Sequence, residues 1–428
     1  MNRIAVFKYL IKEFHEFEFP EIITRELAIP QTNKIISLVG SRRVGKTFYF
    51  YQLINNLLDK GVSKEYILYI NFEDDRLFPI KTGELNDLLE AYYELYPDLK
   101  NKKKYFFFDE IQNVKNWEIF VRRIVDKEKV EMYITGSSSK LLSKEIATSL
   151  RGRTLTFYLY PLSFKEFLKF KNIQVEKDIS YSTKRFKIKY LFKEYLEYGA
   201  FPEVVKSEKL KQDILSNYFE MVIYRDLVER FSIRNINLLK MLSKYLITNV
   251  SSRFSINSYY KSLKQETKVS KETILKYLSH LSDINLIHLV PIFSYSLKVQ
   301  QVNPSKAYCI DTGLRNAVSL RFSEDEGRLA ENVVFIELKR RGHEIFYWKN
   351  TKEVDFVIKD KNNKIIAFNV SYTDEIDERE ITGLQEFKIK YSSKIKDLII
   401  LTKDAEGKKG NITLIPLWKW LLNEKLKP

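Results

Sequence analysis

The 428-residue chain is poor in cysteine and histidine, the residues on which covalent and metal-based frameworks depend. It contains one cysteine, Cys309, and four histidines scattered along the sequence. One cysteine excludes a disulfide framework and a zinc site built on cysteines, and dispersed histidines disfavour a histidine-based metal site. Because a chain without disulfides suits a reducing compartment, we expect a cytoplasmic protein.

Long apolar runs and chain-breaking residues are also scarce. The longest apolar runs, such as residues 397–402, are far shorter than a membrane span, and the N-terminus lacks a secretory signal pattern. We therefore expect no membrane partner. With only 13 glycines and 10 prolines, the chain should form long helices and strands with few flexible linkers. A hydrophobic content of 44% excludes a disordered chain, and the length indicates roughly two to four domains.

The charge balance favours anionic partners. Lysine and arginine number 72 against 56 aspartates and glutamates, which gives a formal net charge of +16. Such an excess is typical of proteins that bind nucleic acid, nucleotides or acidic lipid. No lysine block is long enough to be decisive, and a solvated lysine-rich surface would give the same count.

A phosphate-binding loop is predicted near the N-terminus. Residues 34–39 form a short apolar run that predicts a buried strand, residues 40–47 are Gly-Ser-Arg-Arg-Val-Gly-Lys-Thr, and a helical pattern follows. In this setting, backbone N–H groups and the helix N-terminus would hold phosphate oxygens. Lys46 would reach the β- and γ-phosphates of ATP, and the Thr47 hydroxyl would ligate Mg²⁺. The predicted nucleotide-binding residues are Gly40, Ser41, Arg42, Arg43, Val44, Gly45, Lys46, Thr47 and Phe48.

Two adjacent carboxylates close a later apolar run. Residues 104–108 predict a strand, and Asp109 and Glu110 follow it directly. In a Walker B pattern the first acid holds Mg²⁺ and the second polarises the attacking water, so Asp109 becomes a metal ligand and Glu110 a catalytic residue. The alternative is a strand that ends in two solvated acids. Their order after Lys46, with one strand between, favours ATP and Mg²⁺ as cofactors.

A further strand at residues 130–135 ends in polar residues. Thr135, Ser137 and Ser138 are candidates for sensing the γ-phosphate. The alternative is an N-cap for the next helix, a position that serine fills well. Alternating strands and helices around the phosphate-binding loop predict a parallel sheet covered on both faces.

Several stretches together resemble one family. Residues 40–47, 70–77, 108–114, 135–143 and 159–168 occur in the order found in prokaryotic, and especially archaeal, AAA-type ATPases with a C-terminal domain called DUF4143. The resemblance covers nearly the whole chain. It implies that Arg153 is catalytic beside Lys46 and Glu110, acting on the γ-phosphate of its own or a neighbouring subunit. An ordinary surface arginine is the alternative, and Arg151 competes for the role.

The middle of the chain alternates apolar and charged residues at helical spacing. Residues 171–235 predict a helical lid and connector, and 236–315 predict three helices followed by paired strands, the order of a winged helix. Lys268, Lys271 and Lys276 would then contact DNA phosphates. A winged helix that contacts protein or packs on other domains is the alternative.

The C-terminal region, residues 316–428, resembles a restriction-endonuclease-like fold. An active member carries a helix glutamate, an aspartate and then Glu-x-Lys on the next strand, which together hold a divalent metal. Glu331 and Asp355 match the first two positions, but Asn369 and Ser371 stand where the Glu-x-Lys residues belong. The sequence therefore predicts a degenerate nuclease fold used for binding or assembly.

Taken together, these patterns predict an α/β protein: a P-loop parallel sheet with a helical lid, a winged helix and a restriction-endonuclease-like domain. The predicted domains are 1–170, 171–235, 236–315 and 316–428. The predicted function is an Mg²⁺-dependent AAA-type ATPase whose nucleotide state is coupled to double-stranded DNA. The alternatives are a slow nucleotide-gated switch or scaffold that binds a protein partner or further copies of itself, and a metal-dependent nuclease.

Overall fold

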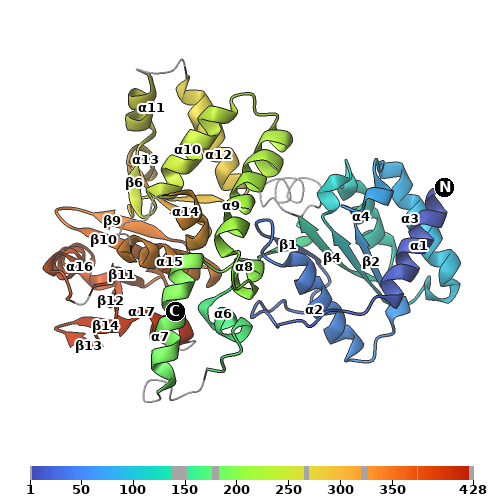
Figure 1. Ribbon diagram of the computed structural model, residues 1–428, viewed down its shortest axis with the longest axis horizontal. Helices are drawn as coiled ribbons and strands as arrows, with labels where there is room; N and C mark the ends of the chain where they lie inside the picture. The colour runs from blue at the N-terminus through green and yellow to red at the C-terminus, as the bar shows by residue number, and fades with distance from the viewer. Residues whose placement is uncertain are drawn as a thin grey trace. The chain divides into compact units, whose positions relative to one another are not determined.

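A computed structural model describes most of the chain: residues 2–136, 150, 152–175, 183–264, 269–319, 326–373 and 375–423. The chain divides into two compact units, residues 1–159 and 160–428, each with its own sheets (Figure 1). Three predicted site residues, Ser137, Ser138 and Lys268, lie outside the described residues, as does Arg151, the alternative to Arg153.

The first unit is built on a parallel five-stranded sheet. Its strands lie in the order β2-β3-β4-β1-β5, all neighbouring pairs are parallel, and β1 lies between β4 and β5. The core strands are almost fully buried, as expected when helices cover both faces. The strands are β1 (Ile35–Val39), β2 (Ile67–Asn71), β3 (Lys104–Asp109), β4 (Val130–Gly136) and β5 (Thr154–Tyr158).

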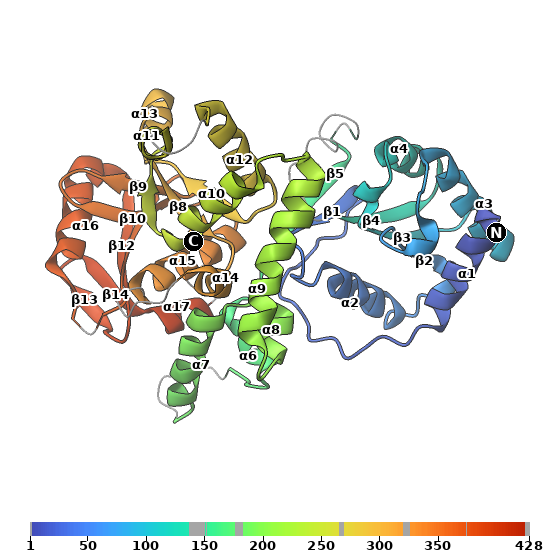
Figure 2. The ribbon, with the colours of Figure 1, turned by 45° about the horizontal axis from the view of Figure 1, so that its top comes forward.

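Helices cover the two faces of this sheet, and alternate side chains of β3 contact helices on opposite faces. Phe106 contacts Tyr92 of α3 and Phe108 contacts Phe120 of α4, whereas Phe107 meets Phe50 of α2 on the opposite face. Figure 2 shows α2 apart from α3 and α4. The helices are α1 (Arg3–Glu16), which packs on α3, α2 (Lys46–Leu58), α3 (Leu85–Leu95) and α4 (Trp117–Lys127), with short turns η1 (Lys64–Tyr66), η2 (Asp75–Leu77), η3 (Thr82–Glu84), η4 (Pro97–Leu99) and η5 (Ile111–Asn113).

The second unit begins with a group of helices. Its first helix, α6 (Phe164–Phe170), starts at a capping box in which Ser163 and Glu166 satisfy each other's backbone N–H groups. This helix packs on α7 and α8 within the second unit, although the sequence analysis had grouped it with residues 1–170. The group continues with α7 (Lys184–Tyr198), α8 (Pro202–Lys206), α9 (Lys211–Met221) and the π-helical η7 (Val222–Glu229).

A small antiparallel sheet follows, in the order β6-β8-β7. We call residues 236–310 the three-stranded module. Three helices and the pair β7–β8 were predicted, but β6 was missed because it has only three residues, of which one is buried. The elements are α10 (Ile236–Thr248), β6 (Ser252–Phe254), α11 (Ile256–Lys264), α12 (Lys271–Asp283), β7 (Ile287–Val290), α13 (Leu297–Val302) and β8 (Ser305–Cys309), and α14 (Thr312–Val318) comes next.

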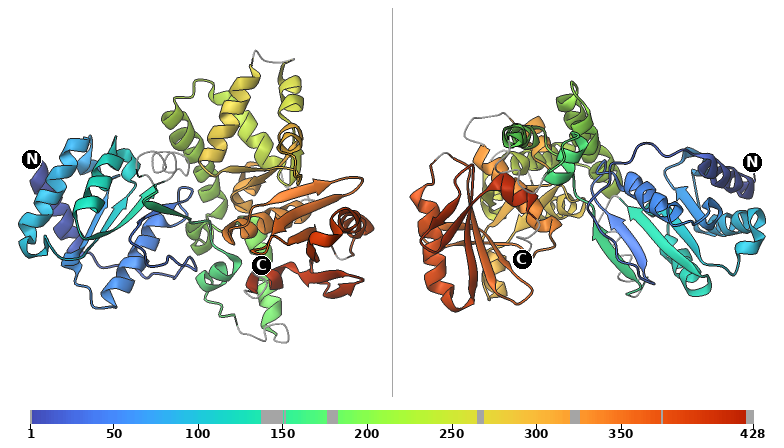
Figure 3. Two further views of the ribbon diagram at one scale, coloured as in Figure 1. Left: turned by 180° about the vertical axis from the view of Figure 1, so that it is seen from behind. Right: turned by 90° about the horizontal axis from the view of Figure 1, so that it is seen from below.

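The chain ends in a mixed six-stranded sheet, which we call the six-stranded domain. Its order is β13-β14-β12-β11-β10-β9; α16 packs on one face, and α15 and α17 contact strands on the other, as Figure 3 shows. The elements are α15 (Glu326–Arg340), β9 (Phe346–Lys349), β10 (Glu353–Lys359), β11 (Ile365–Ser371), α16 (Glu378–Tyr391), η9 (Ser392–Lys394), β12 (Ile395–Thr402), β13 (Gly407–Lys409), β14 (Ile412–Pro416) and α17 (Leu417–Leu422).

The predicted fold class is confirmed at the level of architecture. The chain is α/β, with a parallel sheet of the P-loop type and a separate C-terminal sheet domain. No helix among the described residues is long and apolar enough to cross a membrane.

Candidate functional site

The loop at residues 40–47 connects β1 to α2 and turns tightly. Gly45 and Arg43 have φ angles of 95° and 68°, both in the left-handed region. A Cβ atom on Gly40 would lie 2.4 Å from the carbonyl oxygen of Leu159, so a side chain does not fit there. Helix α2 starts at Lys46, immediately after this turn. The loop therefore brings a helix N-terminus to the carboxyl edge of the sheet, where such termini attract anions.

The side chain of Lys46 is buried in this loop. Only 5% of it is exposed, and its Nζ atom donates to the carbonyl oxygen of Gly40 at 3.3 Å. The same atom lies 3.2 Å from Oε1 of Glu110, which follows β3. Two segments that are 64 residues apart in the chain thus meet through one ion pair. The sequence analysis placed both residues in the catalytic site.

Asp109, the last residue of β3, is held by three hydroxyl groups. The Thr47 hydroxyl donates to Oδ2 at 2.6 Å, the Tyr69 hydroxyl donates to the same oxygen at 3.2 Å, and the Thr135 hydroxyl donates to Oδ1. Burial, followed by the charge of Glu110, raises the pKa of the Asp109 carboxyl. A hydroxyl and a carboxylate in contact supply the hard oxygen ligands that Mg²⁺ prefers.

Glu110 is fixed in direction by its backbone and by its neighbours. Its φ angle is 52°, its N–H donates to the Thr135 hydroxyl at 2.9 Å, and the Gln112 amide donates to its Oε2 at 2.5 Å. Burial alone would raise the pKa of this carboxyl, but Lys46, Gln112 and Arg42 together hold it below its usual value. Glu110 is therefore ionised at neutral pH, the state that a general base needs.

The structure adds contacts that the sequence analysis did not find. Tyr69 belongs to β2, where a tyrosine among aliphatic residues was the only available signal. The N-terminal arm also reaches the loop, because the Arg25 guanidinium donates to the carbonyl oxygen of Val44 at 2.8 Å. At the loop's exposed side, Arg42 pairs with Glu73 at 3.1 Å.

Arg153 lies at the opposite end of the sheet from the phosphate-binding loop. Its carbonyl oxygen accepts from the N–H of Ile35, the first residue of β1, whereas the loop follows Val39, the last. Roughly 13 Å of strand separates these ends. The guanidinium pairs with Asp126 at 3.2 Å. The placement does not fit a contact with a γ-phosphate in the same chain, so only a role at a neighbouring copy's nucleotide stays a prediction.

The predicted DNA-contact residues on α12 lie on its outer face. Lys271 and Lys276 are exposed, while Ile274 and Tyr277 of the same helix are buried. Ser270 caps the helix by accepting from the N–H of Thr273. The two lysines are therefore available to an external partner.

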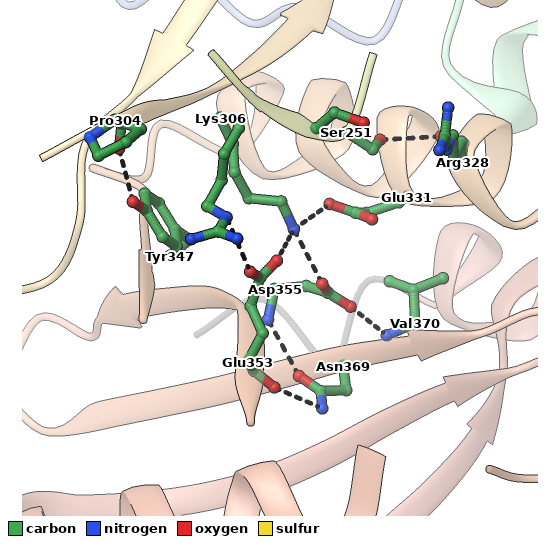
Figure 4. Close-up of polar contacts among 12 residues, drawn as sticks. Ser251, Pro304, Lys306, Arg328, Glu331, Tyr347, Glu353, Asp355, Asn369 and Val370 are labelled. Atoms are coloured by element: carbon green, nitrogen blue, oxygen red, sulfur yellow. Dashed lines mark hydrogen bonds and ion pairs between the residues drawn. The ribbon is translucent and has the colours of Figure 1, made fainter. Parts of the chain in front are cut away.

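Two of the predicted nuclease positions, Glu331 and Asp355, contact a buried lysine that the sequence analysis missed (Figure 4). The Nζ atom of Lys306, from β8, lies 2.7 Å from Glu331, 2.8 Å from Glu353 and 2.9 Å from Asp355, and 2% of its side chain is exposed. We call these four residues the Lys306 cluster. Lysine is absent at position 371, as the sequence indicates, and a lysine from a different strand, β8, lies among the carboxylates instead. The available signal was a lysine directly before the apolar residues of strand β8.

The charges within the Lys306 cluster modify one another. Burial alone would lower the pKa of Lys306, but Asp355, Glu331 and Glu353 raise it well above its usual value. Burial and the charge of Asp355 raise the pKa of Glu331 to about 8. The Lys306 ammonium is therefore held in its charged form.

Asn369 forms hydrogen bonds with the backbone of two residues of this cluster. Its side chain is fully buried; Oδ1 accepts from the N–H of Asp355 at 3.0 Å, and Nδ2 donates to the carbonyl oxygens of Glu353 and Glu380 at 3.3 and 3.0 Å. Ser371 instead contacts Thr373 at 3.3 Å and does not touch the cluster. An amide at position 369 is required because it both donates and accepts.

An Asn369→Asp variant should be less stable by about 1–3 kcal/mol, because two part-buried carbonyl oxygens lose their donor. The urea midpoint of unfolding, followed by tryptophan fluorescence, measures this loss. Asn350→Asp makes the same change at an exposed turn and should leave the midpoint unchanged. Equal midpoints for both variants would show that the hydrogen bonds donated by the Asn369 amide do not contribute to stability.

The first unit combines a parallel sheet, a phosphate-binding loop and paired carboxylates at one edge, which defines the fold of an AAA-type P-loop ATPase. Residues 32–168 match a family described as an AAA domain. Residues 189–326 and 326–420 match two domains of unknown function, DUF8612 and DUF4143. The chain therefore belongs to the family of AAA-domain proteins that carry a C-terminal DUF4143 domain, as the sequence resemblance predicted.

Relatives of similar length occur in archaea and bacteria. The chain is 43% identical over 426 residues to the uncharacterized protein MJ1544 of Methanocaldococcus jannaschii, covering 94% of this chain and 91% of that protein. It is 33% identical over 394 residues to an uncharacterized protein of Haemophilus influenzae, covering 91% and 94%. The Walker-type ATPase PABY2304 of Pyrococcus abyssi shares 14% identity, with a TM-score of 0.44 over 67% of this chain and 91% of that one.

Proposed function

We propose that the chain hydrolyses ATP with the help of Mg²⁺ at the carboxyl edge of its parallel sheet. The observation that supports this most is the meeting of Lys46 and Thr47 from the phosphate-binding loop with Asp109 and Glu110 from the end of β3. An ammonium, a hydroxyl and two carboxylates in contact are the groups that phosphoryl transfer from ATP requires. The AAA domain itself implies nucleotide binding.

Each residue has a separate task in this reaction. Lys46 binds phosphate oxygens once it exchanges its contact with Glu110 for them. Thr47 and Asp109 would hold Mg²⁺, which when bound supplies positive charge to the β- and γ-phosphates. Glu110 accepts a proton from the water whose oxygen bonds to the γ-phosphorus, while the bond to the β–γ bridging oxygen breaks. The products are ADP and inorganic phosphate.

The proposal also couples nucleotide state to double-stranded DNA. The net charge of +16 favours a polyanionic partner, and the elements from α10 to β8 follow the order of a winged helix. In that arrangement the exposed face of α12, with Lys271 and Lys276, would approach the phosphates of DNA. Arg153 would act only on nucleotide held by a neighbouring copy.

Phosphate release by the full chain tests both parts of this proposal. We expect hydrolysis that requires Mg²⁺, stops in EDTA and rises several-fold with double-stranded DNA. A hydrolysis rate that does not change when DNA is added would contradict the coupling to DNA but would not contradict the ATPase activity. Binding of ATP without turnover, with or without DNA, would contradict hydrolysis and favour a nucleotide-gated switch that binds a protein partner.

A further inference from the structure

Lysine is concentrated on one surface of the six-stranded domain. Residues 359–364 form the end of β10 and the turn into β11, and residues 388–397 form the end of α16 and the start of β12. Together they contain seven lysines and two acidic residues, Asp360 and Asp397, which gives a net charge of +5 out of the +16 of the 428-residue chain. We call the lysines the basic surface; they are Lys359, Lys361, Lys364, Lys388, Lys390, Lys394 and Lys396. Nearly a third of the net charge of the chain therefore belongs to two short segments.

The sheet brings these two segments together. Lys359 is opposite Ile365 in the antiparallel pair of β10 and β11, and Ile365 is opposite Ile395 in the parallel pair of β11 and β12. Lys396 of the second segment pairs with Asp360 of the first at 3.1 Å. Neither segment is a long lysine block in the sequence, but strand pairing joins them into one charged surface.

An exposed tyrosine from the three-stranded module contacts two of these lysines. Tyr295 lies between β7 and α13, and 60% of it is exposed. The ammonium groups of Lys394 and Lys359 lie 4.5 and 5.6 Å from the centre of its ring, and Lys394 also donates to its hydroxyl at 3.2 Å. A cation is attracted to the face of an aromatic ring. The ring therefore holds two positive charges close to each other at the surface.

The positive charge of the basic surface is not compensated by the protein itself. All seven lysines are exposed, and within the part of the chain that the structure describes, Lys396 alone among them has an ion pair. Neighbouring charges of one sign repel each other, and salt screens this repulsion only in part. A surface of this kind attracts a partner that carries many negative charges.

We propose that the basic surface binds the phosphate backbone of double-stranded DNA. The inference rests on the proposed coupling to DNA and gives it a second contact surface, on a different part of the second unit from α12. Besides the lysines, the two segments expose Asn362, Asn363, Ile389, Ser392, Ser393 and Asp397. Asparagine and serine commonly contact phosphate oxygens. A lipid surface requires apolar side chains that insert into it, and of these the two segments, both fully described, expose only Ile389.

Fluorescence anisotropy with a labelled DNA duplex, without nucleotide, tests the inference on the full chain. The double variant Lys359→Gln/Lys394→Gln should bind at least about tenfold more weakly than wild type, and the slope of log K against log salt should fall by roughly two, because two phosphate contacts are lost. Lys408→Gln/Lys409→Gln removes the same charge from exposed β13, which lies four strands from β10, and should change affinity less than about twofold. Lys359→Arg/Lys394→Arg keeps both charges and should bind within about twofold of wild type.

The outcomes separate this inference from the proposed function. If Lys271→Gln/Lys276→Gln weakens DNA binding but Lys359→Gln/Lys394→Gln does not, DNA binding by α12 stands and this inference fails. If wild type hydrolyses ATP but binds no duplex at low salt, the coupling to DNA and this inference both fail while the ATPase activity stands. An arginine variant that binds as weakly as the glutamine variant would show that charge is not the cause. Vesicles of anionic phospholipid that bind wild type but not the glutamine variant, with equal DNA affinities, would place a membrane surface there and overturn the DNA assignment.

Discussion

Replacing Glu110 by glutamine is expected to lower the rate of ATP hydrolysis by at least about 100-fold, because a positioned general base contributes roughly 10²–10⁴-fold. Glutamine has nearly the same shape but cannot accept the proton of the attacking water. ATP binding should persist, since Lys46 keeps its contact with the carbonyl oxygen of Gly40 and gives up only the 3.2 Å ion pair.

Phosphate release at saturating ATP and Mg²⁺ measures the rate, and a fluorescent ATP analogue measures binding. Glu90→Gln is a matched control, since it removes one carboxylate from the exposed face of α3, away from the sheet edge that holds the site. That control should hydrolyse ATP like wild type. A Glu110→Gln rate within about threefold of the wild-type rate would exclude Glu110 as the base.

The nucleotide site was predictable because its motifs are local in sequence. A strand, a tight loop and a helix contain all of residues 40–47, and Asp109 with Glu110 directly ends β3. Parallel strands carry their carboxyl ends to one edge of a sheet, so the meeting of the two motifs followed from the fold class. Tyr69 escaped prediction because its contact with Asp109 depends on which strand lies beside β3, and pattern alone does not give strand order.

Arg153 illustrates the same limit. The family resemblance implies a function for Arg153 but does not show at which end of the parallel sheet the residue lies. Only the parallel pairing of β5 with β1, in which Thr154 is opposite Ile35, places Arg153 at the amino edge of the sheet. Register is a tertiary property, so a motif close to the catalytic residues in sequence can still lie a strand length away.

The Lys306 cluster has consequences for how the second unit moves. Lys306 belongs to the three-stranded module, and its three partners belong to the six-stranded domain. The Tyr347 hydroxyl also donates to the carbonyl oxygen of Pro304 at 2.5 Å, and the N–H of Phe293 donates to the carbonyl oxygen of Tyr347 at 2.6 Å. These contacts join the three-stranded module to the six-stranded domain across the boundary predicted at residue 315. Any motion driven by nucleotide should therefore carry the module and the domain together.

Replacing Lys306 by methionine should destabilise the second unit by about 3–5 kcal/mol. The cost arises because three partly buried carboxyl groups lose the ammonium that lies within 2.9 Å of each, while methionine keeps most of the side-chain volume. Urea unfolding followed by tryptophan fluorescence measures this loss, since Trp348, Trp418 and Trp420 all lie in the second unit. Lys298→Met, on the exposed face of α13, should leave the midpoint unchanged.

A second substitution separates loss of charge compensation from loss of packing. Adding Asp355→Asn to Lys306→Met removes one of the uncompensated carboxylates, so the double variant should be more stable than the single Lys306→Met variant. Neighbouring charges that act as one unit give such non-additive effects. If the double variant is instead less stable than Lys306→Met by the full cost of Asp355→Asn alone, the two residues are not coupled. The Lys306 cluster would then join the module and the domain through packing and not through charge.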